Sequence, residues 1–287
     1  MRNSISPSRR WRQSLTTAVL AGVLFAASAV ALSAHDFWIV PTAFEVATDG
    51  ALEVHGQTST AFPTSLSAVA PDRVAEARLI GAAGEERIGD LSVSGKSLRI
   101  RHRPTTAGQR VVAVGLVTRT SRAASAALKR YIALEGAPEL AERYERDGIL
   151  PTTDSVTQRT TKYAKTLVEV GRGGPRAFRR TAGHPLEFVP VTDPATLHMG
   201  DTLVVQLLFR GRPLAGAHLH AGAAPAEGDT TKARDVSIVT GDDGEARLPI
   251  DRAGPWNVRT LHAAPAEGAA GTWDVFFATL VFRAAGH

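Results

Sequence analysis

The residues best suited to chemistry lie in one short stretch, Ser33-Ala34-His35-Asp36-Phe37-Trp38. If the chain is cleaved beside His35, a free α-amine and the His35 imidazole lie next to each other. Both nitrogens are substantially unprotonated near neutral pH, because an α-amine has a pKa of about 7.7–8.0 and histidine one of about 6.5. Nickel(II) and copper(II) favour nitrogen donors of this kind. The stretch therefore predicts a metal chelate at a new N-terminus, anchored by the two aromatic residues that follow it.

Residues 1–34 have the three parts of a secretory signal peptide. Four arginines and no acidic residue are followed by an apolar run over 18–27 and by the small-residue site Ala31-Leu32-Ser33-Ala34. Cleavage after Ser33 would leave Ala34 first, whereas cleavage after Ala34 would leave His35 first. An uncleaved membrane anchor is the alternative, but the apolar run is interrupted by small residues, which favours removal. We expect a periplasmic protein whose signal peptide is cleaved near Ser33 and Ala34.

Composition excludes several classes of function. The chain has 33 basic and 28 acidic residues, and loss of the four signal arginines leaves a net charge of only +1. No basic stripe remains to indicate nucleic-acid binding. The absence of cysteine excludes a disulfide framework and thiolate chemistry. The sequence has no Gly-x-Ser-x-Gly nucleophile elbow, phosphate-binding loop or dinucleotide fingerprint, so we expect the protein not to be an enzyme.

Hydrophobic periodicity predicts a mainly β protein. Short alternating segments separated by glycine and aspartate turns are typical of β-sandwiches of the immunoglobulin or prealbumin type. Between them, Leu128, Tyr131 and Ile132 recur at helical spacing, and Pro138 suits the first turn of a second helix. Residues 159–170 are interpreted as a helix that runs into a strand. The predicted organisation is a β-sandwich domain at 35–120, a helical insertion at 121–165, a connecting strand and loop at 166–185, and a second sandwich at 186–287.

Additional ligands for a metal would come from histidines elsewhere in the chain. His262 follows a strand predicted over 256–261 and is the preferred candidate, the alternative being a strand-end histidine that bonds a loop carbonyl. His218 and His220 alternate with Leu219, which we expect to face inward, so both histidines share the outward face. They could share a metal or simply be solvated. Other candidates are His55 and Asp274. Asp36 could bind the metal or orient His35.

Five segments of the chain resemble a known family over nearly the whole mature length. They occur in family order: His35-Asp36-Phe37-Trp38, Tyr163-Ala164-Lys165-Thr166-Leu167, His184 to Pro190, Gly211 to Ala217, and Trp256-Asn257-Val258-Arg259. The segments resemble the NikM-like periplasmic proteins of unknown function associated with nickel uptake. The resemblance implies an exported two-sandwich protein that handles nickel or cobalt. It also implies chelation by the N-terminal amine, the following amide and a histidine at position two, which Ala34-His35 would reproduce.

We therefore expect a periplasmic protein that binds nickel, cobalt or copper through Ala34 or His35, with His262 as the additional ligand. Its expected role is accessory to metal uptake or handling, with a membrane metal transporter as a partner. The sequence lacks the multi-span membrane region of NikM, so transport by this chain alone is not expected. Two alternatives stay open. One is an interaction module that presents sandwich loops to a transporter or a carbohydrate without metal. The other is a copper-dependent oxidase in which an N-terminal His35 forms a histidine brace.

Overall fold

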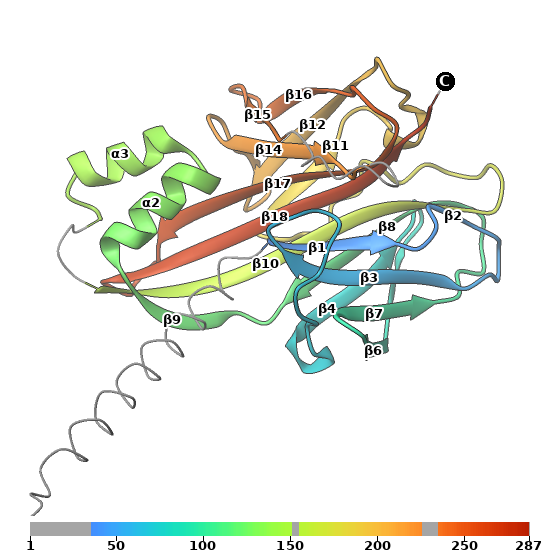
Figure 1. Ribbon diagram of the computed structural model, residues 1–287, viewed down its shortest axis with the longest axis horizontal. Helices are drawn as coiled ribbons and strands as arrows, with labels where there is room; N and C mark the ends of the chain where they lie inside the picture. The colour runs from blue at the N-terminus through green and yellow to red at the C-terminus, as the bar shows by residue number, and fades with distance from the viewer. Residues whose placement is uncertain (1–35, 151–154, 226–234, 287) are drawn as a thin grey trace, which may run out of the picture. The chain divides into compact units, whose positions relative to one another are not determined.

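One ten-stranded sheet, shared by both halves of the chain, forms the centre of the fold (Figure 1). The computed structural model describes residues 36–150, 155–225 and 235–286. The order of the central sheet is β15 (Val236–Val239), β14 (His218–Ala223), β17 (Gly254–Pro265), β18 (Thr272–Ala284), β10 (Ser155–Val170), β8 (Gly108–Leu116), β4 (Val74–Ile80) and β5 (Glu85–Arg87). Two further strands, β2 (Glu45–Val46) and β9 (Arg119–Ala124), pair with β10.

The parallel pair of β10 and β18 joins the two halves of the chain. It runs from Thr157 opposite Thr272 to Thr166 opposite Val281. β10 is 16 residues long and rich in threonine and valine, whose branched side chains suit a pleated sheet. The prediction of a helical insertion over 121–165 is therefore wrong for residues 155–165, which are strand throughout. The two predicted sandwiches also share this central sheet instead of forming two separate pairs of sheets.

Two smaller sheets cover opposite faces of the central sheet. One contains β1 (Asp36–Pro41), β3 (Leu52–Ser59), β7 (Ser97–His102) and β6 (Asp90–Ser94), in that order. The other contains β11 (Leu186–Pro190), β12 (Thr202–Phe209), β13 (Arg212–Pro213) and β16 (Glu245–Pro249). Phe37 of β1 packs in one core with Ala164 of β10, whereas Phe188 of β11 packs in another core with Leu167. Side chains alternate along a strand, so Ala164, at an even position of β10, and Leu167, at an odd position, point to opposite faces. The two covering sheets therefore lie on opposite sides of the central sheet.

Two helices share one face of the central sheet with β1. α2 (Ser125–Glu135) and α3 (Pro138–Arg146) pack Ile132 and Tyr144 against Leu261 and Phe277. The predicted helical positions and the place of Pro138 in the first turn of α3 are confirmed. We call this side, covered by β1, α2 and α3, the helix face. Short 3₁₀ turns lie at Pro71–Arg73 and Pro194–Thr196.

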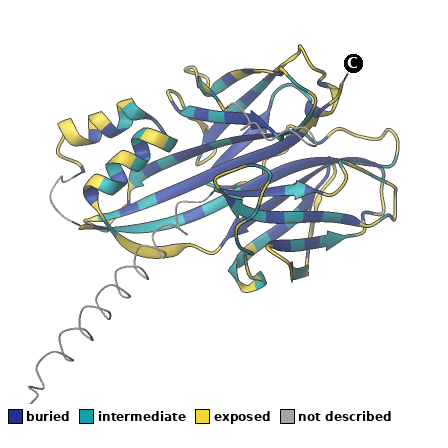
Figure 2. Ribbon diagram, viewed as in Figure 1, coloured by how far each residue is buried: buried dark blue, intermediate teal, exposed yellow. Residues whose placement is uncertain are grey.

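Burial follows this layered arrangement. The central strands are buried along much of their length, whereas α2 and α3 expose one side (Figure 2). Among the described residues, no helix combines the length and the apolar character needed to cross a bilayer.

A buried ion pair connects the central sheet to β11 on the face opposite the helix face. Lys165 Nζ lies 3.1 Å from Glu187 Oε2, and their side chains are 2% and 3% exposed. The surrounding backbone completes the hydrogen bonding: Lys165 donates to the carbonyls of Arg180 and Phe188, and Glu187 accepts from the amides of Ala182 and Gly183. Because both charges are desolvated, each depends on the other for compensation.

Replacing Lys165 with methionine should leave the Glu187 carboxylate buried without its cation. We expect the free energy of unfolding to fall by about 3–5 kcal/mol, measured by urea denaturation, since removal of one partner leaves an uncompensated charge. Lys96→Met is the matched control, because Lys96 is exposed in the turn between β6 and β7. Equal stability of the two variants would contradict a structural role for the pair.

Candidate functional site

The start of β1 is firmly anchored, as the sequence predicts. Ala34 and His35 lie outside the described residues, which begin at Asp36. Phe37 and Trp38 are each 1% exposed. Trp38 Nε1 donates to Gln57 Oε1 at 3.0 Å, and its ring meets Phe62 edge-on at 5.5 Å. The backbone immediately after His35 is therefore fixed by a core contact and a side-chain hydrogen bond.

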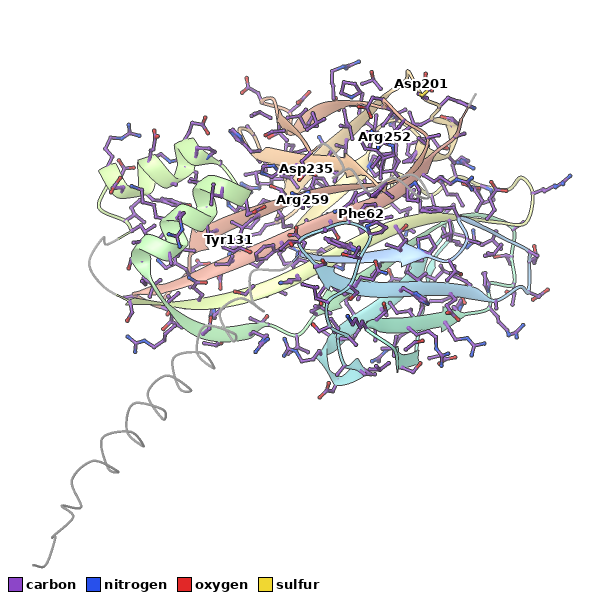
Figure 3. The ribbon with its side chains drawn as sticks, in the orientation of Figure 1. Phe62, Tyr131, Asp201, Asp235, Arg252 and Arg259 are labelled. Carbon is purple, nitrogen blue, oxygen red and sulfur yellow. The ribbon has the colours of Figure 1, made fainter. Side chains whose placement is uncertain are left out.

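Asp36 is tied to the helix face by Arg259. Arg259 Nε lies 3.0 Å from Asp36 Oδ2, and Arg259 Nη2 lies 2.6 Å from Asp235 Oδ2. Thr279, the register partner of Arg259 on β18, donates its hydroxyl to the carbonyl of Phe37 at 2.8 Å. Arg259 and Asp235 are labelled in Figure 3, with Tyr131 on α2 beside them. Neighbouring side chains on β17 and β18 thus hold the first two described residues.

The groups around Asp36 form a mostly desolvated set of charges. Burial raises the pKa of Asp36 to about 6, although the positive charge of Arg259 opposes this rise. Burial lowers the pKa of Lys162 to about 8, with the negative charge of Asp36 acting in the other direction. Burial also raises the pKa of the Tyr131 phenol. The Asp36 cluster is defined as Asp36, Tyr131, Glu135, Lys162, His220, Asp235 and Arg259, which interact electrostatically with one another.

His220 brings a ring nitrogen to this cluster. It lies directly opposite Arg259 in the pairing of β14 with β17, so both side chains project from the helix face. Among the described residues, its Nε2 is buried and has no hydrogen-bond partner. The ring also hydrogen-bonds the backbone of Leu134 on α2, while burial and the Arg259 charge lower the pKa of His220. A neutral imidazole held by one nitrogen leaves the other able to bind a metal.

His218 shares the helix face with His220 but already has a partner. Its Nε2 lies 3.1 Å from Glu139 Oε2 on α3. The predicted alternation is confirmed, because Leu219 is fully buried on the other face. The expectation that the two histidines lie on an outward face is wrong, however, since α2 and α3 pack on that side.

His262 lies on the opposite side of the sheet from Asp36. It sits between Leu261 and Ala263, which pack with the helices, so its own side chain points to the other face. Its ring packs on Phe209 with centroids 4.4 Å apart. It also lies within β17, which continues to Pro265, and not at a strand end as predicted. The structure therefore brings His220, and not His262, to the side on which Asp36 lies.

The other candidates from the sequence are also separate from the Asp36 cluster. His55 lies opposite Val40, near the other end of β1, and contacts Glu53 at 2.9 Å. Asp274 is held by Arg159 through two contacts of 2.6 and 2.8 Å. Within the described parts of the chain, no three histidine, aspartate or glutamate side chains converge as a metal site. The sequence analysis did not single out four residues of the cluster, namely Glu135, Lys162, Asp235 and Arg259, although Arg259 ends the segment Trp256-Asn257-Val258-Arg259.

The burial of His262 should make the stability of the folded protein more sensitive to acid. Burial lowers the pKa of His262 from 6.5 to about 4, with the charges of Arg210 and Arg143 adding to the shift. Since the unfolded chain binds this proton first, the contribution to stability is present above pH 6.5 and is lost as the pH falls towards 4. When the pH falls from 7 to 4.5, the free energy of unfolding should therefore decrease by about 2–3 kcal/mol less in His262→Gln than in the wild type.

Urea denaturation at the two pH values measures this difference. His198→Gln is the control, because the His198 side chain is 53% exposed. Equal acid sensitivity of wild type and His262→Gln would contradict the buried, uncharged state of His262.

Comparisons with known proteins place the chain in a family. The D0-D1 domain of intimin has 11% identity and a TM-score of 0.22, and the match covers 86% of this chain and 97% of that one. Murine CEACAM1b has 8% identity and a TM-score of 0.21, covering 88% and 100%. Similarity this low supports no argument, and no curated protein matches the chain significantly. The family described as "Domain of unknown function (DUF4198)" matches residues 32–264, so the chain belongs to the DUF4198 family.

Proposed function

We propose that the mature protein binds a divalent transition metal (nickel, cobalt or copper) at its N-terminus. The ligands would be the α-amine of Ala34 or His35 and the His35 imidazole. The observation that carries the proposal is the firm anchoring of the next residues, since Phe37 and Trp38 are both buried and Trp38 donates a hydrogen bond to Gln57. The resemblance of His35-Asp36-Phe37-Trp38 to NikM-like proteins supports it. The proposed role is in periplasmic metal handling or uptake, with a membrane metal transporter as partner.

The proposed donors favour a transition metal. They are an amine and an imidazole. Such donors suit nickel, cobalt and copper, whereas magnesium and calcium prefer oxygen ligands. Cleavage after Ser33 would add the amide of His35 as a further planar nitrogen donor.

Anchoring of the terminus makes tight binding feasible. Ordering a free chain end costs about 1–2 kcal/mol of conformational entropy per residue. Burial of a large side chain contributes roughly 1.5–3 kcal/mol, and both Phe37 and Trp38 are buried. The folded protein has thus already offset much of the ordering cost next to His35.

Calorimetry with nickel(II) and copper(II) on the correctly processed protein tests the proposal. His35→Ala should abolish tight binding, because it removes one ligand of the chelate. His198→Gln is the matched control and should bind like the wild type, because its exposed side chain belongs to no proposed ligand set.

A second experiment tests whether the α-amine is a ligand. A short uncleaved N-terminal extension displaces the amine but leaves every side chain in place, so it should weaken binding nearly as much as His35→Ala. Equal affinity with and without the extension would exclude the amine. Unchanged affinity in His35→Ala would remove the site altogether.

A further inference from the structure

We propose that a cleft at the carboxyl ends of β10 and β18 binds a small primary amine in its protonated form, next to the carboxylates of Glu45 and Glu169. The parallel pairing of the two strands ends at Thr166 and Val281. Beyond this point β10 continues beside β8 and β2, whereas β18 stays beside β17, so the strands diverge (Figure 1). Such a divergence leaves a crevice at the strand ends. The inference does not depend on the proposed metal site.

The size and walls of the cleft suit a small ligand with an apolar body. Its volume is about 190 Å³. Pockets for drug-sized molecules are larger, at about 300–1,000 Å³. The apolar lining comes from Phe44, Leu167, Pro194 and Phe282. A short aliphatic chain would bury its surface against these side chains, and aromatic rings also attract a nearby cation.

Two glutamates lie side by side in the cleft. Glu45 is opposite Glu169 in the parallel pairing of β2 with β10, so both side chains project from the same face. The next pair, Val46 and Val170, projects from the other face, where Val46 packs in the core that contains Phe37. Glu45 is exposed, and both glutamates line the cleft. Like charges on neighbouring strands repel each other, and a cation between them would relieve that repulsion.

The charge of Glu169 is only partly compensated by the protein. Its Oε2 lies 2.9 Å from Arg176 Nη1, whereas its Oε1 is buried and has no hydrogen-bond partner among the described residues. Arg176 also donates from Nε to Asp193 Oδ2 at 2.6 Å. One guanidinium thus serves two carboxylates. An ammonium group in the cleft would add the compensating charge that Arg176 alone does not supply.

A hydrogen-bonded network fixes this carboxylate from behind. The fully buried Gln109 donates from Nε2 to Asp193 Oδ1 at 2.9 Å. Gln109 Oε1 in turn accepts from the amides of Ala177 and Phe178. Asp193 therefore holds Arg176 in one place, and Arg176 holds the glutamate. A preformed site of this kind binds its ligand without the entropy cost of ordering its own side chains.

An organic cation fits the cleft better than an anion or a metal ion. Arg283 also lines the cleft, but it follows Phe282, which shares a core with Leu167, so the Arg283 side chain projects from the face opposite to Glu169. Calcium takes about six to eight oxygen ligands. Within the described residues, no three histidine, aspartate or glutamate side chains converge on a common point.

Titration of the ¹⁵N-labelled protein with n-butylamine tests the inference, with amide chemical shifts as the measurement. The amine is protonated at neutral pH, because alkylamines such as lysine have a pKa of about 10.4. n-Butanol is the neutral ligand of the same shape. We expect saturable shifts of the amides that line the cleft, and an affinity for n-butanol that is about tenfold lower. Added salt should weaken only the binding of the amine.

Variants of the cleft test the assigned residues. Glu45→Gln and Glu169→Gln should each lower the affinity for n-butylamine about tenfold and leave that for n-butanol unchanged. Glu267→Gln is the matched control and should bind like the wild type, because Glu267 is exposed in the turn at the other end of β18. Ala195→Trp should abolish binding of both ligands, since Ala195 is exposed and lines the cleft.

Several results would overturn the inference. They are equal affinities for amine and alcohol, the absence of saturable shifts in the cleft, and unchanged amine binding in Glu45→Gln and Glu169→Gln. If Glu169→Gln fails to fold, Glu45→Gln and Ala195→Trp carry the test, and unchanged amine binding in either of them overturns the site. Tighter binding of a capped lysine peptide than of n-butylamine would show that the cleft takes a side chain of another protein, which would overturn the assignment of a small free amine.

Discussion

The buried ion pair of Lys165 and Glu187 fixes which side of β10 faces which layer. A lysine with 2% exposure needs its carboxylate and backbone partners, and these lie only on the β11 side. Because side chains alternate along a strand, a shift of one residue would remove Lys165 from Glu187 and turn Lys162 into the apolar core. The pairing of β10 with β18, and of β18 with β17, then determines which residues of β18 and β17 point to each face of the sheet. As a result of these strand pairings, the side chain of Arg259 lies on the helix face.

The two faces of the central sheet consequently receive different kinds of polar contact. On one face, Arg159 and Asp274 link neighbouring strands within the sheet itself. On the helix face, Arg259 links the sheet to another layer, because Asp36 belongs to β1. A contact within a sheet reinforces a register that backbone hydrogen bonds already define. A contact between layers positions a segment that has no backbone ladder to the central sheet, and here that segment is β1.

Local sequence patterns predict the individual strands well, because alternation is a local property. The inward side of Leu219 follows directly from it. The start of β10 was missed, since its partner β18 lies more than a hundred residues away and only tertiary pairing favours extended backbone there. The expectation that His218 and His220 face outward was wrong for a related reason. Alternation shows that neighbouring residues differ in face, but it cannot say which face the helices and β1 will cover.

Buried polar groups differ in how fully they are paired. Lys165 and Glu187 have a full set of partners, as a structural ion pair requires. On the helix face, by contrast, the buried His220 Nε2 and both polar atoms of the Asn257 amide have no hydrogen-bond partner among the described residues, and the same holds for Thr166 Oγ1 on β10. Complete pairing is thus found where two full charges are buried together, because an uncompensated buried charge costs more than an unpaired neutral polar atom.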